Sequence, residues 1–564
     1  MKKIIFLIVL SAIIVSCDDY LNVTDYTQKS SQNFPVNYDD CNQALAAAYT
    51  SMGLGEPFNS FMIAALASDD ALGGGAPFND NARSYDRWMK YDPDMFKNLW
   101  KNAYRGIFRA NKLRESLDQV DFSSSEQYDL VLGETYFLRA FFYFNLVRLF
   151  GEVPLILSAQ EPVNYPKSPA SEIYPHIASD LTKAIELLPS VAYNSDPSRL
   201  GHATKWAAEA LMARVYLFYT GYYQQSELPL AEEGSVTKQM VIEYLNDLMD
   251  NSGHGLVDDY RNLWLYTNDY TKEDYKYTAG KGLSWAGDGN KEIVWSMKHG
   301  VCTYYDDAQN NRISQWFGVR GQHENTIFPF DWGFGFGPVN PIMVDQWILD
   351  EPNDTVRRWG SVIDMNDPRE GVRDYFNNDP MLEETKLYQK KYSIIQVYTD
   401  KSDPDTANWV WDGYDNVVNG SSLGSNSSQE QIFIRYADVL LMHSELTETG
   451  DGINQVRDRA GLSPVSYSLE NLQKERRYEL AFEGIRYWDL LRWYRSEAGV
   501  IIDQNQNGAP VFDIDEPATY EANLTDRIRA TGGFMQIPEF EIGLSGGVLE
   551  QNTGWVGNEG NLIY

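Results

Sequence analysis

Three carboxylates near the C-terminus have a spacing that could support acid–base chemistry. Glu475, Glu479 and Glu483 follow one another at intervals of four residues, so a helix places them on one face. The arginines between and beside them are Arg476, Arg477 and Arg486. Pairing with arginine keeps a carboxylate ionised, whereas a general acid needs a raised pKa. We therefore expect a structural ion network in which these arginines pair with the glutamates.

A second pattern resembles the serine elbow of a hydrolase. Gly543, Ser545 and Gly547 reproduce G-x-S-x-G, but that elbow needs a strand before it and a helix after it, and the sequence predicts neither. None of the six histidines is an obvious partner for Ser545, and H-E-x-x-H, Walker A and dinucleotide G-x-G-x-x-G motifs do not occur. The sequence therefore predicts a protein that is not an enzyme.

The stretch from Asp503 to Gly508 copies the first half of an EF-hand loop, D-x-N-x-N-G. Position twelve of the loop is Ile514 instead of a bidentate Glu, and this excludes a strong EF-hand. The adjacent Asp515 could supply a carboxylate in its place. An ordinary Asx-rich turn is one interpretation. The other is a structural Ca²⁺, the only cofactor considered, held by Asp503, Asn505, Asn507 and Asp513.

The first residues indicate export. Lys2 and Lys3 precede an apolar run from Ile4 to Ile14, which is too short to span a bilayer, and small residues follow. We interpret residues 1–16 as a signal peptide. The Cys17 that follows resembles the acylated cysteine of bacterial lipoproteins, and this implies a lipid-anchored tether over residues 17–38.

Composition excludes several classes of protein. The 564 residues carry 47 Lys and Arg against 80 Asp and Glu, a net charge of −33, and 43% are hydrophobic. Such a chain is too apolar to be disordered and too acidic to favour nucleic acid. The negative electrostatic field of such a chain favours neutral or cationic partners. Three cysteines make no disulfide framework, and whether Cys41 and Cys302 pair is left open.

Helical periodicity dominates both ends of the chain. Gly151 and Gly221 follow two of the expected helices, where a left-handed C-cap is common. Repeated Glu-x4-Arg frames at Glu134 and Glu209 indicate tetratricopeptide-like helix pairs. Residues 54–95, 254–345 and 396–428 lack periodicity and concentrate aromatic and polar residues. The expected helices lie near residues 39–53, 96–120, 125–150, 171–188, 203–221, 236–250, 430–449, 451–460 and 468–495.

Ordered motifs occur along almost the whole chain. The strongest are residues 434–442 (IRYADVLLM), 453–462 (INQVRDRAGL) and 475–493 (ERRYELAFEGIRYWDLLRW). Residues 137–141 (FLRAF), 151–155 (GEVPL), 537–542 (IPEFEI) and 551–555 (QNTGW) agree with them. Together these motifs resemble the SusD/RagB family of outer-membrane lipoproteins, and the resemblance implies a mainly α, SusD-like fold.

In this interpretation, residues 39–564 form one SusD-like domain. Its tetratricopeptide-like helix-pair scaffold spans mainly residues 39–253 and 430–495. Long, irregular, aromatic-rich loops form a binding face, mainly from residues 54–95 and 254–428. The resemblance further implies a non-catalytic protein at the outer-membrane surface, lipid-anchored through Cys17. It would bind an oligosaccharide and deliver it to a SusC-like, TonB-dependent transporter.

The aromatic loops supply the candidate binding residues. A sugar ring has an apolar C–H face and a hydroxyl rim, so it is recognised by flat aromatic rings beside amides, carboxylates or arginine. The family builds its site from corresponding loops, so the resemblance carries over by region only. The candidates are Asp69, Asp70, Asn81, Arg83, Tyr85, Trp88, Trp285, Tyr304, Trp316 and Trp332.

The ligand is expected to be neutral rather than sulfated because the chain is acidic. Three alternatives stay open. The first is binding of peptides, the cargo with which RagB-like members are associated. The second is a glycoside hydrolase, which would need two carboxylates in a cleft. The third is a helical-repeat adaptor that binds no small ligand, which only the predicted helical scaffold suggests.

Overall fold

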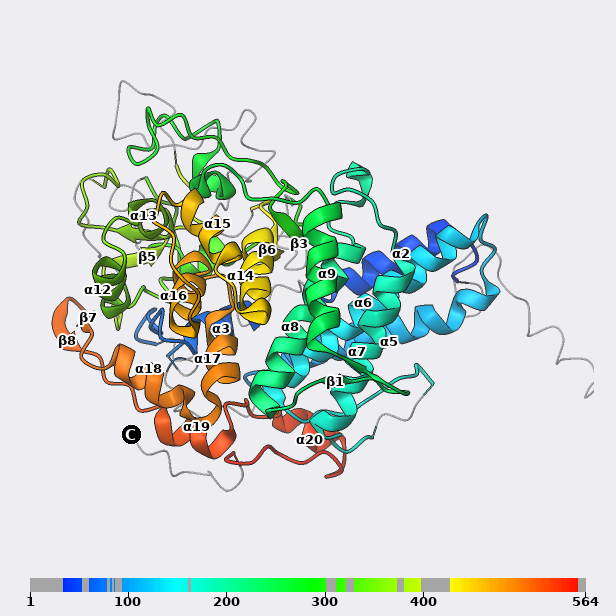
Figure 1. Ribbon diagram of the computed structural model, residues 1–564. Helices are drawn as coiled ribbons and strands as arrows, with labels where there is room; N and C mark the ends of the chain where they lie inside the picture. The colour runs from blue at the N-terminus through cyan, green and yellow to red at the C-terminus, as the bar shows by residue number, and fades with distance from the viewer. Residues whose placement is uncertain are drawn as a thin grey trace, which may run out of the picture.

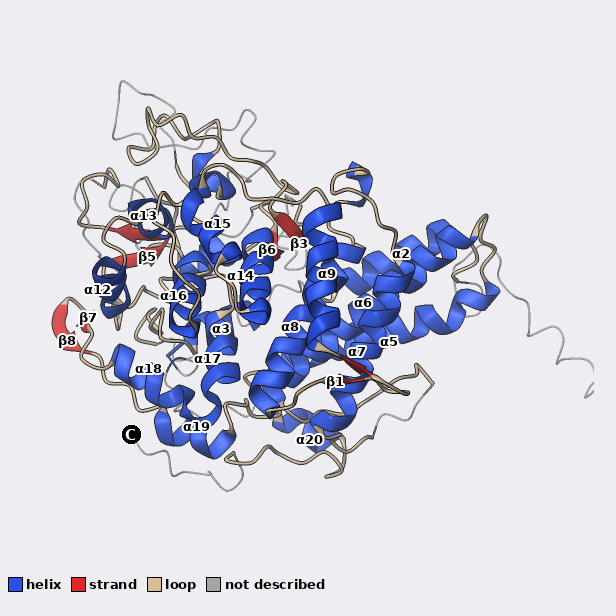
Figure 2. Cartoon of the chain, in the orientation of Figure 1, coloured by secondary structure: helices blue, strands red, loops and turns tan. Residues whose placement is uncertain are grey.

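The computed structural model describes residues 34–52, 60–78, 82–83, 86, 94–160, 164–300, 311–320, 329–372, 380–396 and 427–555. Helices and connecting loops make up most of these residues, and the strands are short (Figures 1 and 2). This confirms the mainly α fold that the sequence predicts. Within the described part, no helix combines the length and apolar character needed to cross a membrane.

The N-terminal half is a layered stack of long helices (Figure 1). Helices α5, α6, α7, α8 and α9 each pack on the next, and α2 covers α5 and α6. Gly106 of α5 permits the close approach of α6, because a Cβ there would lie 2.2 Å from the Phe142 ring. The helices are α2 (Tyr38–Thr50), α5 (Lys97–Ser116), α6 (Ser125–Phe150), α7 (Ala170–Leu187), α8 (Lys205–Tyr223) and α9 (Lys238–Asn251).

A second set of helices completes the scaffold at the C-terminal side. Helix α14 packs on α15, α16 and α9, while α17 packs on α8, so the two halves share one hydrophobic core. The helices are α14 (Tyr436–Thr447), α15 (Asp451–Arg459), α16 (Leu469–Glu479), α17 (Arg486–Tyr494), α18 (Ala498–Gln506), α19 (Thr525–Thr531) and α20 (Glu539–Leu544).

Short elements fill the stretches between these sets. The strands described pair in antiparallel twos: β1 (Leu228–Pro229) with β2 (Ser235–Val236), β3 (Ile293–Met297) with β6 (Gln431–Arg435), β4 (Val362–Asp364) with β5 (Leu387–Gln389), and β7 (Pro510–Asp513) with β8 (Glu516–Thr519). The short helices are α3 (Ser60–Leu66), α10 (Ile313–Phe317), α12 (Pro341–Asp350) and α13 (Thr355–Ser361), with 3₁₀ turns at Leu117–Gln119, Pro197–Arg199, Tyr260–Leu263, Leu265–Thr267 and Arg495–Glu497.

Three local predictions are wrong. Residues 431–435 form β6 instead of the start of a helix, because they complete a ladder with β3. The helix expected over residues 468–495 breaks between α16 and α17, where Phe482 and Gly484 have positive φ and a Cβ on Gly484 would lie 2.8 Å from the Phe61 ring. Gly151 ends α6 with a positive φ of 72°, but its ψ of −85° lies outside the left-handed helical region, whereas Gly221 lies inside α8 and Gln224 is the left-handed cap of that helix.

The glutamate cluster is a buried structural network, but its partners are not the predicted arginines. Glu479 accepts from Arg435 at 2.5 Å, from Arg357 at 3.2 Å and from Arg459. Glu483 also binds Arg435, at 2.7 Å. The network therefore joins β6, α13, α15 and the end of α16, which are distant in sequence.

The arginines next to these glutamates in the sequence form ion pairs with other carboxylates. Arg476 donates to Asp438 and Asp489, each at 2.8 Å. Burial alone would raise the pKa of Asp438, but two arginines outweigh it and lower that pKa to about 2. Arg477 and Arg486 reach back to the N-terminal loop that follows α3.

Candidate functional site

Three loop segments that are far apart in the sequence meet around residues 329–339. Residues 71–76 run antiparallel to residues 335–339, with bridges at Ala71–Val339 and Gly74–Phe336. The same central segment pairs with Arg320 at Gly333 and with Ile395 at Phe330. The face is therefore built from residues 71–78, 311–320, 329–339 and 393–396, and we call it the loop face.

Glycines let these backbones approach closely. Gly74 has φ +66°, and a Cβ on it would lie 2.4 Å from the carbonyl oxygen of Gly335. The Gly75 amide donates to that same oxygen at 3.1 Å. Larger residues would push the two segments apart.

Two aromatic rings are exposed on the loop face. Trp332 is 39% exposed and contacts Phe334 edge to face, with ring centroids 5.2 Å apart, whereas Phe336 is buried. Phe78 is 88% exposed and lies in the turn that follows the last bridge of residues 71–76.

Two arginines hold the backbone beneath these rings. Arg83 donates to the carbonyls of Gly74, Ala76 and Pro77 at 3.0 to 3.2 Å, which fixes the turn that carries Phe78. Arg320 donates to the carbonyl of Phe334 at 3.3 Å. Arg83, a predicted ligand residue, therefore positions the loop.

Two other predicted ligand residues are buried beneath the face. Asp69 accepts from Arg486 at 2.7 and 2.9 Å and from Asn505 at 2.6 Å, and Asp70 accepts from Arg477 at 2.8 Å. Burial would raise the pKa of Asp69, but the two arginines hold it below its ordinary value. For Asp70, burial and the Asp69 charge raise the pKa. Both carboxylates anchor the loop instead of reaching a ligand.

The predicted tryptophans separate into different environments. Trp316 is 4% exposed in the core beneath the face, so the expectation that it would be a stacking surface is wrong. Trp285 is half-buried in another loop, where its amide donates to the carbonyl of Thr267 at 3.0 Å. Trp332 alone of the three lies exposed on the loop face. The predictions for Cys17, Asn81, Tyr85, Trp88 and Tyr304 fall outside the described residues.

Comparison with known proteins identifies the family. A family model described as "SusD family" matches residues 265–555, and one described as "Starch-binding associating with outer membrane" matches residues 19–217. The chain belongs to the SusD family. A similar curated relative is SusD-like protein P38 of Formosa agariphila, 25% identical over 87% of this chain and 91% of its own length.

Solved SusD-like structures share the fold. A laminarin-binding SusD-like protein is 24% identical and superposes with a TM-score of 0.69 over 92% of this chain and 99% of its own. Surface glycan-binding protein A from Bacteroides thetaiotaomicron, solved with laminarihexaose, is 19% identical, with a TM-score of 0.68 over 92% of this chain and 100% of its own. At these identities the similarity establishes the helical SusD fold and leaves the ligand to be argued from this chain.

The four residues considered for calcium are engaged within the protein. Asp503 lies in the last turn of α18 rather than in a loop, and its carboxylate accepts from the amides of Leu524 and Thr525. Asn505 binds Asp69, Asn507 accepts from Ala522, and Asp513 accepts from Glu383. The expected loop geometry is wrong, and in the described chain no three His, Cys, Asp or Glu side chains gather as for a metal ion. Calcium binding itself stays a prediction.

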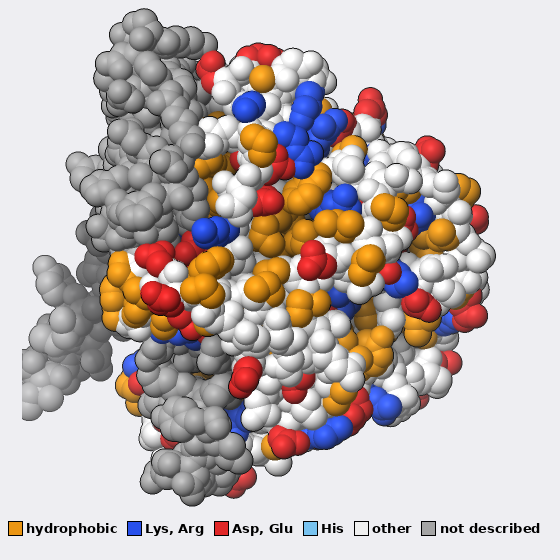
Figure 3. All heavy atoms as spheres, turned by 90° about the vertical axis from the view of Figure 1, so that its left-hand side faces the viewer, with side chains coloured by type: hydrophobic (Ala, Val, Ile, Leu, Met, Phe, Trp, Pro, Cys, Tyr) orange, Lys and Arg blue, Asp and Glu red, His pale blue; other side chains and the backbone are white. Residues whose placement is uncertain are grey.

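A hydrophobic surface beside basic residues was missed by the sequence reasoning. On the face that carries α12, α13 and β5, hydrophobic side chains gather beside lysines and arginines (Figure 3). On α13, the Trp359 ring lies 5.5 Å from the guanidinium of Arg358 and 5.3 Å from that of Arg369. These cation–π contacts cover the ring, so Trp359 is less available for stacking than Trp332.

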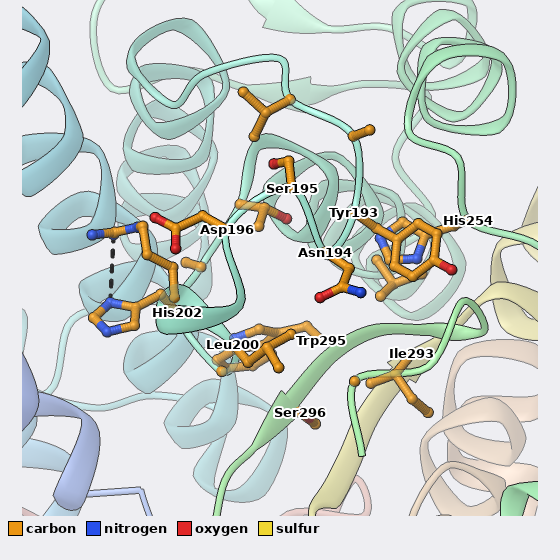
Figure 4. Close-up of a pocket in the computed structure, with 18 of the residues that line it drawn as sticks. Tyr193, Asn194, Ser195, Asp196, Leu200, His202, His254, Ile293, Trp295 and Ser296 are labelled. Carbon is orange, nitrogen blue, oxygen red and sulfur yellow. Dashed lines mark hydrogen bonds between the residues drawn. The ribbon is translucent and has the colours of Figure 1, made fainter. Parts of the chain in front are cut away.

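A cavity of about 260 Å³ lies between β3 and the loop of residues 189–204 (Figure 4). Figure 4 shows Tyr193 beside His254, with Leu200 and Trp295 below Asn194. Burial lowers the pKa of His254 to about 4, which keeps the imidazole neutral, and its Nδ1 bonds the carbonyl of Lys291. His202 is bonded to Glu134. Because most of its exposed lining is apolar, the cavity suits an apolar group better than a sugar chain.

Proposed function

We propose that this SusD-family protein captures a neutral oligosaccharide on the loop face without chemically changing it. The observation that carries the proposal is the exposure of Trp332 and Phe78 on a loop face whose backbone segments are held together by bridges. Stacking on a C–H face needs such rings, and each contributes on the order of 1 kcal/mol. Laminarihexaose bound to a protein of the same fold supports an oligosaccharide as the ligand class.

The charge of the site supports a neutral ligand. Arg83 and Arg320 are both engaged by backbone carbonyls, and the chain as a whole carries −33. The long-range field therefore disfavours sulfated glycans. Family membership supports a cell-surface location, a lipid anchor at Cys17 and delivery to a SusC-like, TonB-dependent transporter in the outer membrane, and these belong to the proposal.

Affinity electrophoresis of the soluble form, starting at Asp18, tests the ligand class. Gels would contain neutral or sulfated polysaccharides, and Trp332→Ala and Phe78→Ala would be compared with Tyr270→Ala, an exposed aromatic residue outside the loop face. We expect retardation by a neutral polysaccharide, weakened in the first two variants only. Equal retardation of all variants would contradict the site, and capture of peptides without any glycan would favour the RagB-like alternative.

A further inference from the structure

A second groove lies on the helical scaffold, between α5, residues 154–159 and 164–165, and α20. Its volume is about 570 Å³, within the range of about 300–1,000 Å³ that is typical of small-ligand sites. Figure 1 shows α5 and α20 away from α12 and α13, on the other side of the molecule. We call this hollow the α5–α20 groove.

An aromatic row forms one wall of this groove. Trp100, Tyr104 and Phe108 are spaced four residues apart on α5, so they share a face of the helix. Trp100 and Tyr104 are tilted against each other with centroids 5.0 Å apart, and the Tyr104 hydroxyl donates to the carbonyl of Pro154 at 2.8 Å. Trp100 is buried, Tyr104 is half-buried and Phe108 is 53% exposed, so the row rises from the floor of the groove to its rim.

Polar groups of both charges also line the groove. Glu541 and Leu544 come from α20, and Lys101 comes from α5. Burial raises the pKa of Glu541, while Lys97 and Lys101 oppose that rise through their charges. Ser158 and Asn164 line the third side. In a chain of net charge −33, the lining of this groove carries one carboxylate and one ammonium group and offers hydroxyl and amide partners.

From this combination we propose that the α5–α20 groove is a second binding site, for a short neutral oligosaccharide. Tyr104 and Phe108, the more exposed rings of the row, supply stacking surfaces, and the surrounding polar groups match a hydroxyl rim. The local charge balance disfavours an ionic ligand of either sign. The site goes beyond the proposed function of the loop face, because it shares no residue with that face and lies on different elements.

Counting bound oligosaccharides tests the second site separately from the first. Native mass spectrometry and calorimetry would use the soluble form from Asp18 with laminarihexaose, maltohexaose and a xyloglucan oligosaccharide as probes. The variants are Phe108→Ala, Trp332→Ala, the double variant and the exposed control Tyr270→Ala. Phe108 is a rim residue, so its removal should leave the circular dichroism spectrum unchanged.

We expect two bound oligosaccharides in the wild type and in Tyr270→Ala, one in each single binding variant, and none in the double variant. Loss of the Phe108 ring should weaken its site at least about fivefold. If Phe108→Ala binds as the wild type does, or if Trp332→Ala binds no probe, the second site is refuted while the loop face stands. If only Phe108→Ala loses binding, the second site stands and the loop-face proposal fails.

Discussion

Replacing Glu479 by Gln tests whether the buried ion network holds the C-terminal helices α15 and α16 to α13 and β6. The Glu479 carboxylate is fully buried and forms ion pairs with arginines from α13, β6 and α15. Gln keeps the shape and one acceptor oxygen, but its amide group turns two N–H donors toward guanidinium groups. Removing one partner of a buried ion pair costs about 3–5 kcal/mol, and the retained acceptor places our expectation near 3 kcal/mol.

Glu186→Gln is the matched control. Glu186 pairs with Lys183 at 3.2 Å, and both side chains are more than half exposed. Such a pair contributes at most about 1 kcal/mol. At about 2.1 cal/mol/K per residue, the unfolding entropy of this chain is about 1.2 kcal/mol/K, so Glu479→Gln should lower Tm by about 2.5 °C and Glu186→Gln by less than about 1 °C.

The pH dependence gives a second readout from the same two proteins. Burial raises the pKa of Glu479, but three arginines outweigh that effect and hold the pKa well below its ordinary value. A carboxylate with a lowered pKa stabilises the fold above its unfolded value of about 4.3, and this contribution is lost as the pH falls. Calorimetric scans should therefore show the wild type and Glu479→Gln converging in the acid range. Equal Tm values for Glu479→Gln and Glu186→Gln at pH 7 would refute the reasoning.

Three further outcomes are expected. Gly106→Ala should lower the free energy of unfolding by about 1–3 kcal/mol despite the better helix propensity of Ala, because the new Cβ would clash with the Phe142 ring. Gly543→Ala, at a position with open space around it, should not lower this free energy. Urea unfolding of the two variants tests the difference. Arg83→Met should weaken glycan retardation in affinity gels while the circular dichroism stays unchanged, since it frees the carbonyls of the turn that carries Phe78, and undiminished retardation would contradict that role. Cys17→Ser should move the full-length protein from the membrane to the soluble fraction, and retention in the membrane would exclude the lipid anchor.

Local periodicity was enough to predict the long helices. The expected helix over residues 125–150 coincides with α6, because apolar residues repeat along it and Gly151 ends it. Residues 431–435 show where this reasoning fails, since they form a strand only in the presence of β3, more than a hundred residues away. Short helices such as α12 and α13 were missed because each is too short for a clear period.

The side-chain partners were harder to predict than the elements. Glu479 was correctly expected in an ion network, but spacing along one helix suggested Arg476, whereas the fold supplies Arg435 and Arg459. Trp316 and Trp332 look alike in the sequence, since both stand in polar, aromatic loops. Only the packing of residues 329–339 decides that one is buried and the other exposed.

The positions of Asp69 and Asp70 explain why the scaffold motifs do not name the ligand. Arg477 and Arg486, from the stretch that most resembles the SusD family, hold these carboxylates at the base of the loop face. Gln506 binds the carbonyls of Ser68 and Ala71 in the same turn. The motif therefore fixes where the loop begins, while Phe78 lies farther along this loop and Trp332 lies on residues 329–339, which pair with it. Neither ring takes part in the ion pairs that the motif supplies, so the ligand has to be identified by measurement at the exposed rings.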